Sequence, residues 1–313
     1  MLRMQTSWIL EAVGELMTVE SIFMPFFHRF TDLNKLAKLT NIRVNVNSPL
    51  DTQAMLAKTW FGPGKTIFYE RNLYKYNQTL SSPLESGESN PFESWVNKLF
   101  TRSQIDYLYY WRECAFEMED SDQREIFWSA VYFVISYWLS TNKRSNAYLW
   151  EPTKIMAYYL HTHNDFIKTS EGRPKITNLP LEELEASDSS LVVFPLLFDE
   201  DDNDENKLQT IFYAWNHGIS DLKHAKKEIN SALNNYMVPF NERNDYSLFS
   251  KLASKASSAA FVWSGDSLAP KVYEEVLADP IRKAFKNIFT KSKLLMKAVD
   301  KSSDSYDYQL ILY

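Results

Sequence analysis

Only a few residues in this chain have types and spacings that suggest chemistry. His161 and His163 invite a metal-binding interpretation, but no cysteine or acidic cluster lies near them in the sequence to complete a site. On a helix, positions two apart point about 200° from each other around the axis, so the two imidazoles would face different ways. We therefore predict no metal site and interpret both as surface or satisfied histidines.

A second candidate lies at residues 142–150, where two basic residues stand beside amides and aromatic rings. Lys143 and Arg144 suit phosphate contacts, and Tyr148 and Trp150 suit stacking on bases. This combination makes the run a candidate nucleic-acid interface. The alternative, which we leave open, is a solvated loop between two helices.

The composition predicts a well-packed globular protein. Of 313 residues, 15% are aromatic and only 7 are glycine, which is few for a domain whose backbone must approach a nucleoside or phosphate closely. The formal net charge of −6 argues against a stand-alone DNA-binding protein, because neutralisation of phosphates by basic residues supplies much of DNA affinity. A local basic patch is still compatible with this balance.

The cysteine content and apolar runs indicate the compartment. Cys114 is the single cysteine, which excludes an internal disulfide framework and fits a reducing environment. The longest apolar stretch, Ile126–Leu139, is interrupted by serines and is too short to span a bilayer. The chain does not open on the pattern of a secretory signal. We therefore expect a cytoplasmic protein that does not enter a membrane.

Strand-like and helix-like segments alternate at both ends of the chain, which predicts an α/β fold with a parallel sheet. A helical block rich in aromatic residues interrupts this alternation at roughly 92–170. We expect residues 1–80 and 171–313 to form one α/β core and residues 91–170 to form a helical insert. The strands are expected near Ser21–Met24, Ile42–Val46, Lys175–Leu179, Leu191–Leu196, Ala259–Trp263 and Tyr308–Ile311.

Local patterns give three more detailed expectations. Phe92–Phe100 has the spacing of an aromatic-rich helix that opens the insert. Asp122 stands where it would cap a later helix of the same block. The acidic run Asp199–Asn206 is expected to be a solvated loop. The aromatic residues of the insert are expected to pack its core, and any exposed excess would mark a protein interface.

The order of these segments resembles that of DNA adenine-N6 methyltransferases whose target-recognition region precedes the catalytic tetrapeptide. Ser21–Phe30 is similar to the family's first strand and its cofactor loop, Pro-Phe-x-Gly-Ser-Gly. Ile42–Leu50 resembles the second strand, which ends in an acidic residue that binds the cofactor ribose. Leu191–Phe198 resembles the strand that leads to Asp-Pro-Pro-Tyr, which holds the amino group of the target base. The resemblance implies a Rossmann-like methyltransferase sheet whose recognition region is the helical insert.

The cofactor loop of that family is changed in this sequence. Pro25 is kept, but Phe27, His28 and Arg29 stand where glycines are expected. Bulky side chains there would fill the space that the methionine part of S-adenosylmethionine needs. His28 and Arg29 could instead bind an anion such as phosphate, although we favour the plugging of an abandoned pocket.

The two other motifs have lost their polar groups as well. Asn47 and Ser48 replace the carboxylate that would pair with the ribose hydroxyls. At the tetrapeptide, a proline takes the position of the aspartate, so no carboxylate remains to orient the target nitrogen. The relic positions are Pro195, Leu196, Leu197 and Phe198.

We therefore expect a catalytically inactive, methyltransferase-like protein that binds no cofactor. It would act as a scaffold or recognition subunit with a protein partner or a second copy, and DNA would be contacted, if at all, through the helical insert. Family analogy suggests restriction–modification or phage defence as the setting. Two alternatives stay open: an active adenine methyltransferase with atypical motifs that needs a partner chain, and a structural protein that binds neither cofactor nor DNA.

Overall fold

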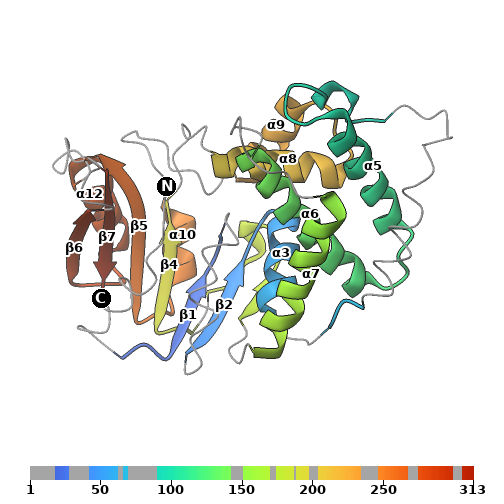
Figure 1. Cartoon of the computed structure of the whole chain (residues 1–313). Helices are drawn as coiled ribbons and strands as arrows, with labels where there is room; N and C mark the ends of the chain where they lie inside the picture. The colour runs from blue at the N-terminus through green and yellow to red at the C-terminus, as the bar shows by residue number, and fades with distance from the viewer. Residues whose placement is uncertain are drawn as a thin grey trace.

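A seven-stranded sheet forms the centre of the computed structural model (Figure 1). The structure describes residues 18–27, 42–62, 66–69, 90–141, 151–169, 174–186, 188–196, 204–233, 246–266, 274–298 and 305–313. Along the sheet the strands follow the order β3-β2-β1-β4-β5-β7-β6. The first five are mutually parallel, and β7 runs antiparallel to both of its neighbours. The bounds are β1 Ser21–Met24, β2 Arg43–Asn47, β3 Lys175–Thr177, β4 Leu191–Pro195, β5 Ser258–Asp266, β6 Ser292–Ala298 and β7 Ser305–Leu312.

Both faces of this sheet are covered, as the apolar character of the central strands requires. In β4, Leu191 and Val193 point into one hydrophobic cluster, whereas Val192 and Phe194 point into another. This alternation follows from the two-residue period of a strand. We call the cluster that contains Leu191 the first core and the cluster that contains Phe194 the second core.

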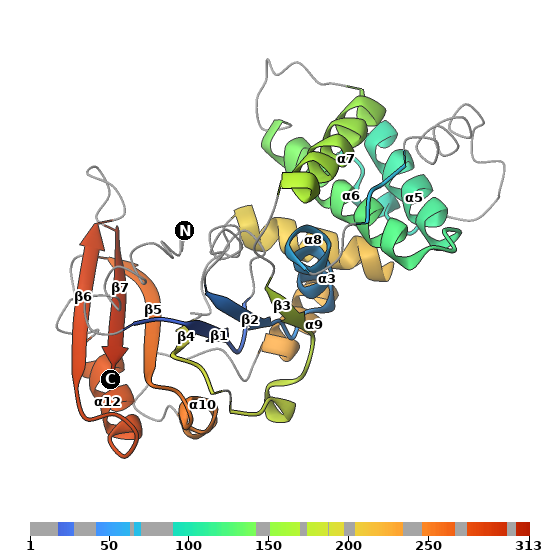
Figure 2. The same ribbon diagram turned by 90° about the horizontal axis from the view of Figure 1, so that it is seen from below.

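Different helices complete each core (Figures 1 and 2). Side chains of α3 and of α5–α8 join the first core, and those of α10, α12 and part of α9 join the second. Figure 2 shows α3 and α8 between the sheet and the group formed by α5, α6 and α7. The helices are α3 Asp51–Phe61, α5 Arg102–Phe116, α6 Ser121–Thr141, α7 Pro152–Thr169, α8 Asp204–His217, α9 Leu222–Leu233, α10 Ser247–Ala253 and α12 Asp279–Phe285. Single turns are formed by η3 Glu93–Trp95, η4 Leu181–Glu183 and the π-helical segment η5 Glu274–Ala278.

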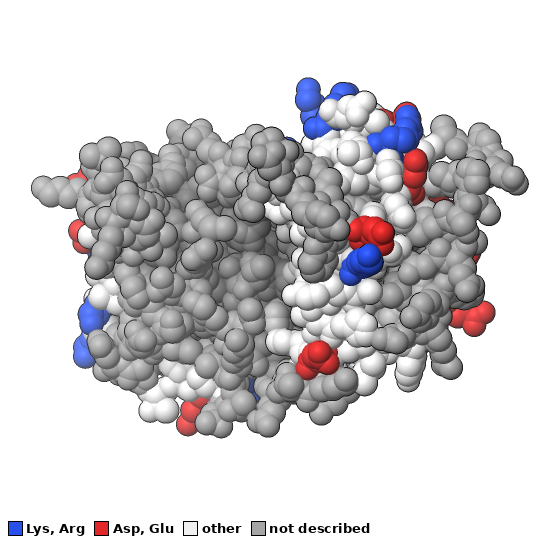
Figure 3. Space-filling model, viewed as in Figure 1, with Lys and Arg blue, Asp and Glu red and all other residues white. Residues whose placement is uncertain are grey.

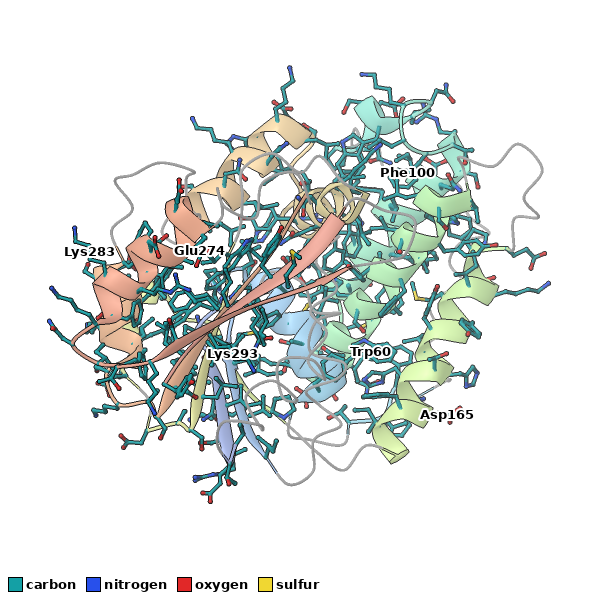
Figure 4. All side chains as sticks on the ribbon, turned by 90° about the vertical axis from the view of Figure 1, so that its left-hand side faces the viewer. Trp60, Phe100, Asp165, Glu274, Lys283 and Lys293 are labelled. Atoms are coloured by element: carbon teal, nitrogen blue, oxygen red, sulfur yellow. The ribbon has the colours of Figure 1, made fainter. Side chains whose placement is uncertain are left out.

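Aromatic rings hold the helical block to the rest of the first core. Trp111 of α5 and Trp138 of α6 stack with centroids 5.9 Å apart, and both are almost fully buried. Trp60 of α3 meets Phe133 of α6 edge to face at 5.1 Å. Figure 4 shows Trp60 at this contact between α3 and the helical block, whereas Asp165 lies on the outer side of α7. The expectation that the aromatic residues of the insert pack a core is confirmed for the buried members of this set.

The α/β class is confirmed, and all six expected strands are present with boundaries that differ by one to three residues at most ends. The seventh strand, β6, was not expected. Apolar residues also recur with helical spacing in the sequence at 50–60, 103–119, 122–139, 152–160, 222–235 and 247–257, and a helix is present in each of these ranges. The division into an α/β core and a separate insert stays a prediction, since both parts contribute to the first core.

Three local predictions need correction. Phe92–Phe100 is not a helix: it contains the short turn η3 and a bridge between Val96 and Phe100. Asn97 lies between them with φ of 60°, a conformation that asparagine tolerates and that ends a helix. The acidic run is not loop throughout, because α8 begins at Asp204.

The cap of α6 also differs from the prediction. Asp120, not Asp122, supplies it, because the Asp120 Oδ1 accepts the backbone N–H groups of Asp122 (2.9 Å) and Gln123 (3.1 Å). Asp120 precedes the helix and is therefore placed to reach the unpaired donors of its first turn.

Candidate functional site

The strand order locates the place where a ligand would be expected. In doubly wound sheets, ligands bind outside the carboxyl ends of the strands, at the point where the order reverses. Here the chain moves from β1 outward to β2 and β3, and later from β4 outward to β5. The reversal therefore lies between β1 and β4, where the resemblance places the family's cofactor and catalytic positions.

The segment after β1 continues along the sheet edge. The Phe27 N–H donates to the carbonyl of Asn47 at 2.9 Å, so the chain stays beside the end of β2. Phe26 and Phe27 are fully buried, Phe27 in the first core and Phe26 in the second. The predicted plugging residues His28 and Arg29 lie outside the described residues, as does the anion-binding alternative that rests on them.

Asn47 joins the ends of three strands. Its Nδ2 donates to the carbonyls of Pro25 and Leu179, each at 3.0 Å. Its Oδ1 accepts the N–H of Leu179 and the hydroxyl of Thr177, each at 2.9 Å. The side chain is fully buried, and both of its polar atoms are engaged within the protein. A carboxylate could not replace it, because two of these four bonds need a donor.

Ser48 continues this arrangement and is also fully buried. Its N–H donates to the carbonyl of Thr177 at 3.1 Å, and its carbonyl accepts the Asn178 side-chain amide at 2.7 Å. Its hydroxyl accepts the N–H of Leu50 at 3.3 Å. The two residues at the predicted ribose position are thus occupied in holding β2 to β3 and to the start of α3.

The end of β4 is apolar and enclosed. Pro195 is the last residue of the strand and pairs with Val262 of β5. The Leu196 N–H donates to the carbonyl of Val262 at 2.8 Å, and its side chain is fully buried in the second core. Leu197 and Phe198, the other two relic positions, lie outside the described residues. Pro195 and Leu196 bring no ionisable group to this edge.

The predicted nucleic-acid residues of the insert, Lys143, Arg144, Tyr148 and Trp150, all fall outside the described residues. Among the described residues, basic side chains gather over α9 and the start of α5 (Figure 3). On α9, three lysines are exposed: Lys223, Lys226 and Lys227.

Sequence reasoning missed a pair of titratable residues next to the sheet edge. The Nε2 of His217, at the end of α8, lies 3.1 Å from the Asp51 carboxylate at the start of α3. The hydrogen bond with Asp51 raises the pKa of His217, against the opposing effect of burial. Burial alone would raise the pKa of Asp51, but the hydrogen bond and charge of His217 outweigh it, and the pKa is lowered. No sequence signal links these residues, because 166 positions separate them.

Tyr213 extends this pair toward α9. Its ring lies over His217, with centroids 4.3 Å apart, and its hydroxyl donates to Glu228 at 3.2 Å. Burial, followed by the charges of Glu228 and Asp51, raises the pKa of Tyr213 to about 12. The phenol therefore stays protonated at neutral pH and acts as a hydrogen-bond donor that ties α8 to α9.

The histidine pair of the insert is split by the fold. His161 is exposed, whereas His163 is buried against Trp60 and its Nε2 lies 3.0 Å from the carbonyl of Thr59. Burial lowers the pKa of His163, which favours the neutral ring. Within the described residues, no group of three or more histidine, cysteine, aspartate or glutamate side chains is arranged to hold a metal ion.

Comparison with models of known protein families and with curated proteins finds no match for this chain. None of the helices in the described part of the chain combines the length and apolar character needed to cross a bilayer.

Proposed function

We propose that this chain is a non-catalytic, methyltransferase-like protein that acts as a scaffold or recognition subunit beside a partner chain. The proposal has two parts, an ancestry and a loss of chemistry, and different observations support each.

Strand order supports the ancestry. The five parallel strands have the order 3-2-1-4-5 of a doubly wound, nucleotide-binding sheet. A purely parallel sheet of that class would continue with a sixth parallel strand beside β5. Here β7 instead lies antiparallel between β5 and β6, and β5 and β7 contain the segments that the resemblance matches to the family's last strands. The topology therefore agrees with the resemblance that the motifs carry.

Asn47 is the main observation that supports the proposed loss of chemistry. At the position where the resemblance requires a carboxylate facing the ribose, this chain has a buried amide whose four hydrogen bonds all end within the protein. Phe27 and Leu196, from the two neighbouring strand ends, are also fully buried. S-adenosylmethionine would have to displace these side chains and leave their partners unpaired, which makes binding unfavourable.

Calorimetric titration of the isolated chain with S-adenosylmethionine tests the proposal. We expect no affinity tighter than millimolar, with or without DNA. An active adenine methyltransferase measured under the same conditions serves as the positive control. Micromolar binding would overturn the proposal and favour the active enzyme with atypical motifs.

A titration in the presence of the native partner distinguishes a catalytic subunit, which needs the partner for activity, from a non-catalytic scaffold. If the partner confers both binding and methyl transfer on this chain, the chain is a catalytic subunit and not a scaffold. If the complex methylates DNA while S-adenosylmethionine binds only to the partner in separate titrations of the two chains, the chemistry belongs to the partner.

A further inference from the structure

Two long stretches of the chain contain no acidic residue, although aspartate and glutamate account for 40 of the 313 residues. They are residues 246–265 and 280–299. The first contains two lysines, and the second contains five lysines and Arg282. In a chain whose formal net charge is −6, these stretches create a local basic surface only if the fold brings them together.

The fold brings the two stretches together at one end of the sheet (Figure 1). The first forms α10 and most of β5, and the second forms most of α12 and all of β6. The two helices contact each other and pack into the second core. In the sheet, Leu312 of β7 pairs with Ala259 on one side and with Ser292 on the other. The starts of β5 and β6 therefore lie about 10 Å apart, because neighbouring strands are separated by about 4.8 Å.

Five lysines from these stretches are exposed, and we call them the lysine surface: Lys251, Lys255, Lys283, Lys286 and Lys291. Within the described part of the chain none of them forms an ion pair, whereas Arg282 pairs with Glu274 and Asp279. Lys291 lies 5.9 Å from the ring centroid of Tyr313, a contact that leaves its positive charge uncompensated. Figure 4 looks onto this side of the molecule and shows Lys283 at its outer edge. The ammonium groups are therefore available to an external anion.

Acidic residues mark the limits of the lysine surface. Toward β4, the Ser257 N–H donates to the carbonyl of Ser189 at 3.1 Å, which places Asp188 near the start of β5. Toward the start of α12, Glu275 is exposed next to the carboxylates that hold Arg282. Between these limits, the surface runs from α10 and α12 to the turns that precede β5 and β6. It lies at the opposite edge of the sheet from the positions that the resemblance assigns to the cofactor.

Neutral side chains that can donate hydrogen bonds are exposed between the lysines: Ser254, Asn287, Thr290 and Ser292. Lysine, serine, threonine and asparagine are residue types that contact the phosphates and sugars of DNA. The aromatic residues of both stretches are instead buried in the second core. They are not available to stack on unpaired bases, as a surface for single-stranded nucleic acid requires. The side chains therefore suit the backbone of a duplex.

We propose that the lysine surface binds the phosphate backbone of double-stranded DNA without reading its sequence. Lysines that neutralise phosphates release counterions, and this release supplies an affinity that does not depend on the bases. The surface lies outside the helical insert, so a contact through Lys143 and Arg144 would add to it. The proposal does not rest on the proposed function, because it would hold whether or not the chain binds S-adenosylmethionine.

Fluorescence anisotropy of the full chain with labelled DNA duplexes, over a salt series, tests this proposal. The test variant combines four changes to glutamine, at Lys251, Lys255, Lys283 and Lys286. It should weaken binding at low salt at least tenfold, and equally for duplexes of unrelated sequence. The slope of log affinity against log salt should fall by about three to four units, since each phosphate contributes about 0.9. The unfolding temperature should stay the same, because all four side chains are exposed.

The matched control makes the same change of charge elsewhere, with glutamine at four exposed lysines of η3 and α9: Lys98, Lys223, Lys226 and Lys227. It should retain most of the affinity. Three outcomes would overturn the proposal. The full chain could bind no duplex at low salt, or the control could lose as much affinity as the test variant. Alternatively, poly-glutamate could displace the duplex as well as unlabelled DNA of equal charge does, which would assign the surface to an acidic protein segment.

Discussion

At the residue scale, Asn47 holds the fold together at the position where the resemblance to methyltransferases would place a cofactor-binding carboxylate. The same side chain that stands at the predicted ribose site connects the loops after β1 and β3 through four hydrogen bonds. The sequence identified Asn47 as a departure from the family pattern. It did not reveal what the amide does, because its partners Pro25 and Leu179 lie 22 and 132 residues away.

Placing a carboxylate at position 47, as the resemblance would require, should destabilise the protein. In Asn47→Asp, the carbonyls of Pro25 and Leu179 lose their donor and face a buried negative charge. Loss of these bonds and burial of an unpaired charge should lower the free energy of unfolding by about 3 kcal/mol or more. Urea denaturation at neutral pH measures the change.

Asn97→Asp is the control for that experiment, because Asn97 is exposed and aspartate tolerates its positive φ. It should change stability by less than about 0.5 kcal/mol. A stable Asn47→Asp protein would contradict this prediction, and a gain of affinity for S-adenosylmethionine in that variant would show that the buried side chains around it do not close the site.

The ion pair of His217 and Asp51 predicts a pH dependence. The pKa of His217 is raised in the folded protein, so its contribution is fully present below the unfolded value of about 6.5 and is lost as the pH rises through the folded pKa. The pKa of Asp51 is lowered, so its contribution is present above about 3.8 and is lost as the pH falls. The pair therefore stabilises the fold most between these limits.

His217→Gln should destabilise the protein by less than about 1 kcal/mol near pH 5.5, because both side chains are partly exposed. At pH 8 to 9 the difference from the unaltered protein should disappear. Denaturation at several pH values checks this, and His224→Gln, which removes the more exposed ion pair with Glu228 (3.1 Å) on α9, is the comparison and should have a smaller effect. A destabilisation that grows with pH would contradict the assignment.

At the element scale, the central strands were predictable because nearly every residue in them is apolar and each run is bounded by a break. β6 was missed because it is an edge strand with lysines in it, and its three successive apolar residues do not alternate. The spacing of Phe92, Trp95 and Leu99 is helical, yet Asn97 reverses the backbone between them. Periodicity therefore predicted which residues are buried there, but not the element that buries them.

The whole of α8 was missed, for a different reason. Its buried residues recur with helical spacing: Leu208, Ile211, Phe212 and Trp215. The acidic run before them was interpreted as a loop, and the helix was not predicted. The consequence for the site was large. α8 contributes His217, so the ion pair with Asp51 could not be inferred without it.

The shared first core predicts that the helical block and the sheet unfold together. Trp138 is 1% exposed and stacks on Trp111. Trp138→Ala should lower the free energy of unfolding by about 3 to 5 kcal/mol, with hydrogen exchange accelerated equally in α6 and in β1, β2 and β4.

Tyr158→Ala is the control, because Tyr158 lies on α7 and is 55% exposed. It should change stability by less than about 1 kcal/mol. Faster exchange confined to α5, α6 and α7 after the Trp138 change would instead show that the helical block opens as an independent unit.

At the scale of the whole molecule, the net charge of −6 makes any DNA affinity depend on a local basic surface. We expect such binding to pass through the insert residues Lys143 and Arg144. Replacing both with glutamate should abolish it or reduce the slope of log affinity against log salt by about two units, since each phosphate contributes about 0.9. Fluorescence anisotropy over a salt series measures this slope.

Lys226→Glu with Lys227→Glu is the control of equal charge, because both lysines are exposed on α9. If this variant loses binding and the insert variant does not, the surface over α9 in Figure 3 is the nucleic-acid interface.

The final prediction concerns the partner. Two large aromatic side chains of the helical block are about half exposed, Phe116 on α5 at 49% and Tyr158 on α7 at 55%. Aromatic residues are enriched in the buried centres of protein interfaces. The edge strand β6 is a poorer candidate, because lysines along an edge discourage strand pairing. We therefore expect a second chain, or a second copy, to cover part of Phe92–Leu160.

Light scattering and affinity purification from the native host test this expectation. The double change Phe116→Asp and Tyr158→Asp should dissociate the complex. Met296→Asp on β6 should not, although Met296 is 50% exposed, because β6 lies at the other end of the sheet from the helical block (Figure 1). A monomer that co-purifies with no protein would remove the basis for a scaffold, since a chain without chemistry must act through its surface.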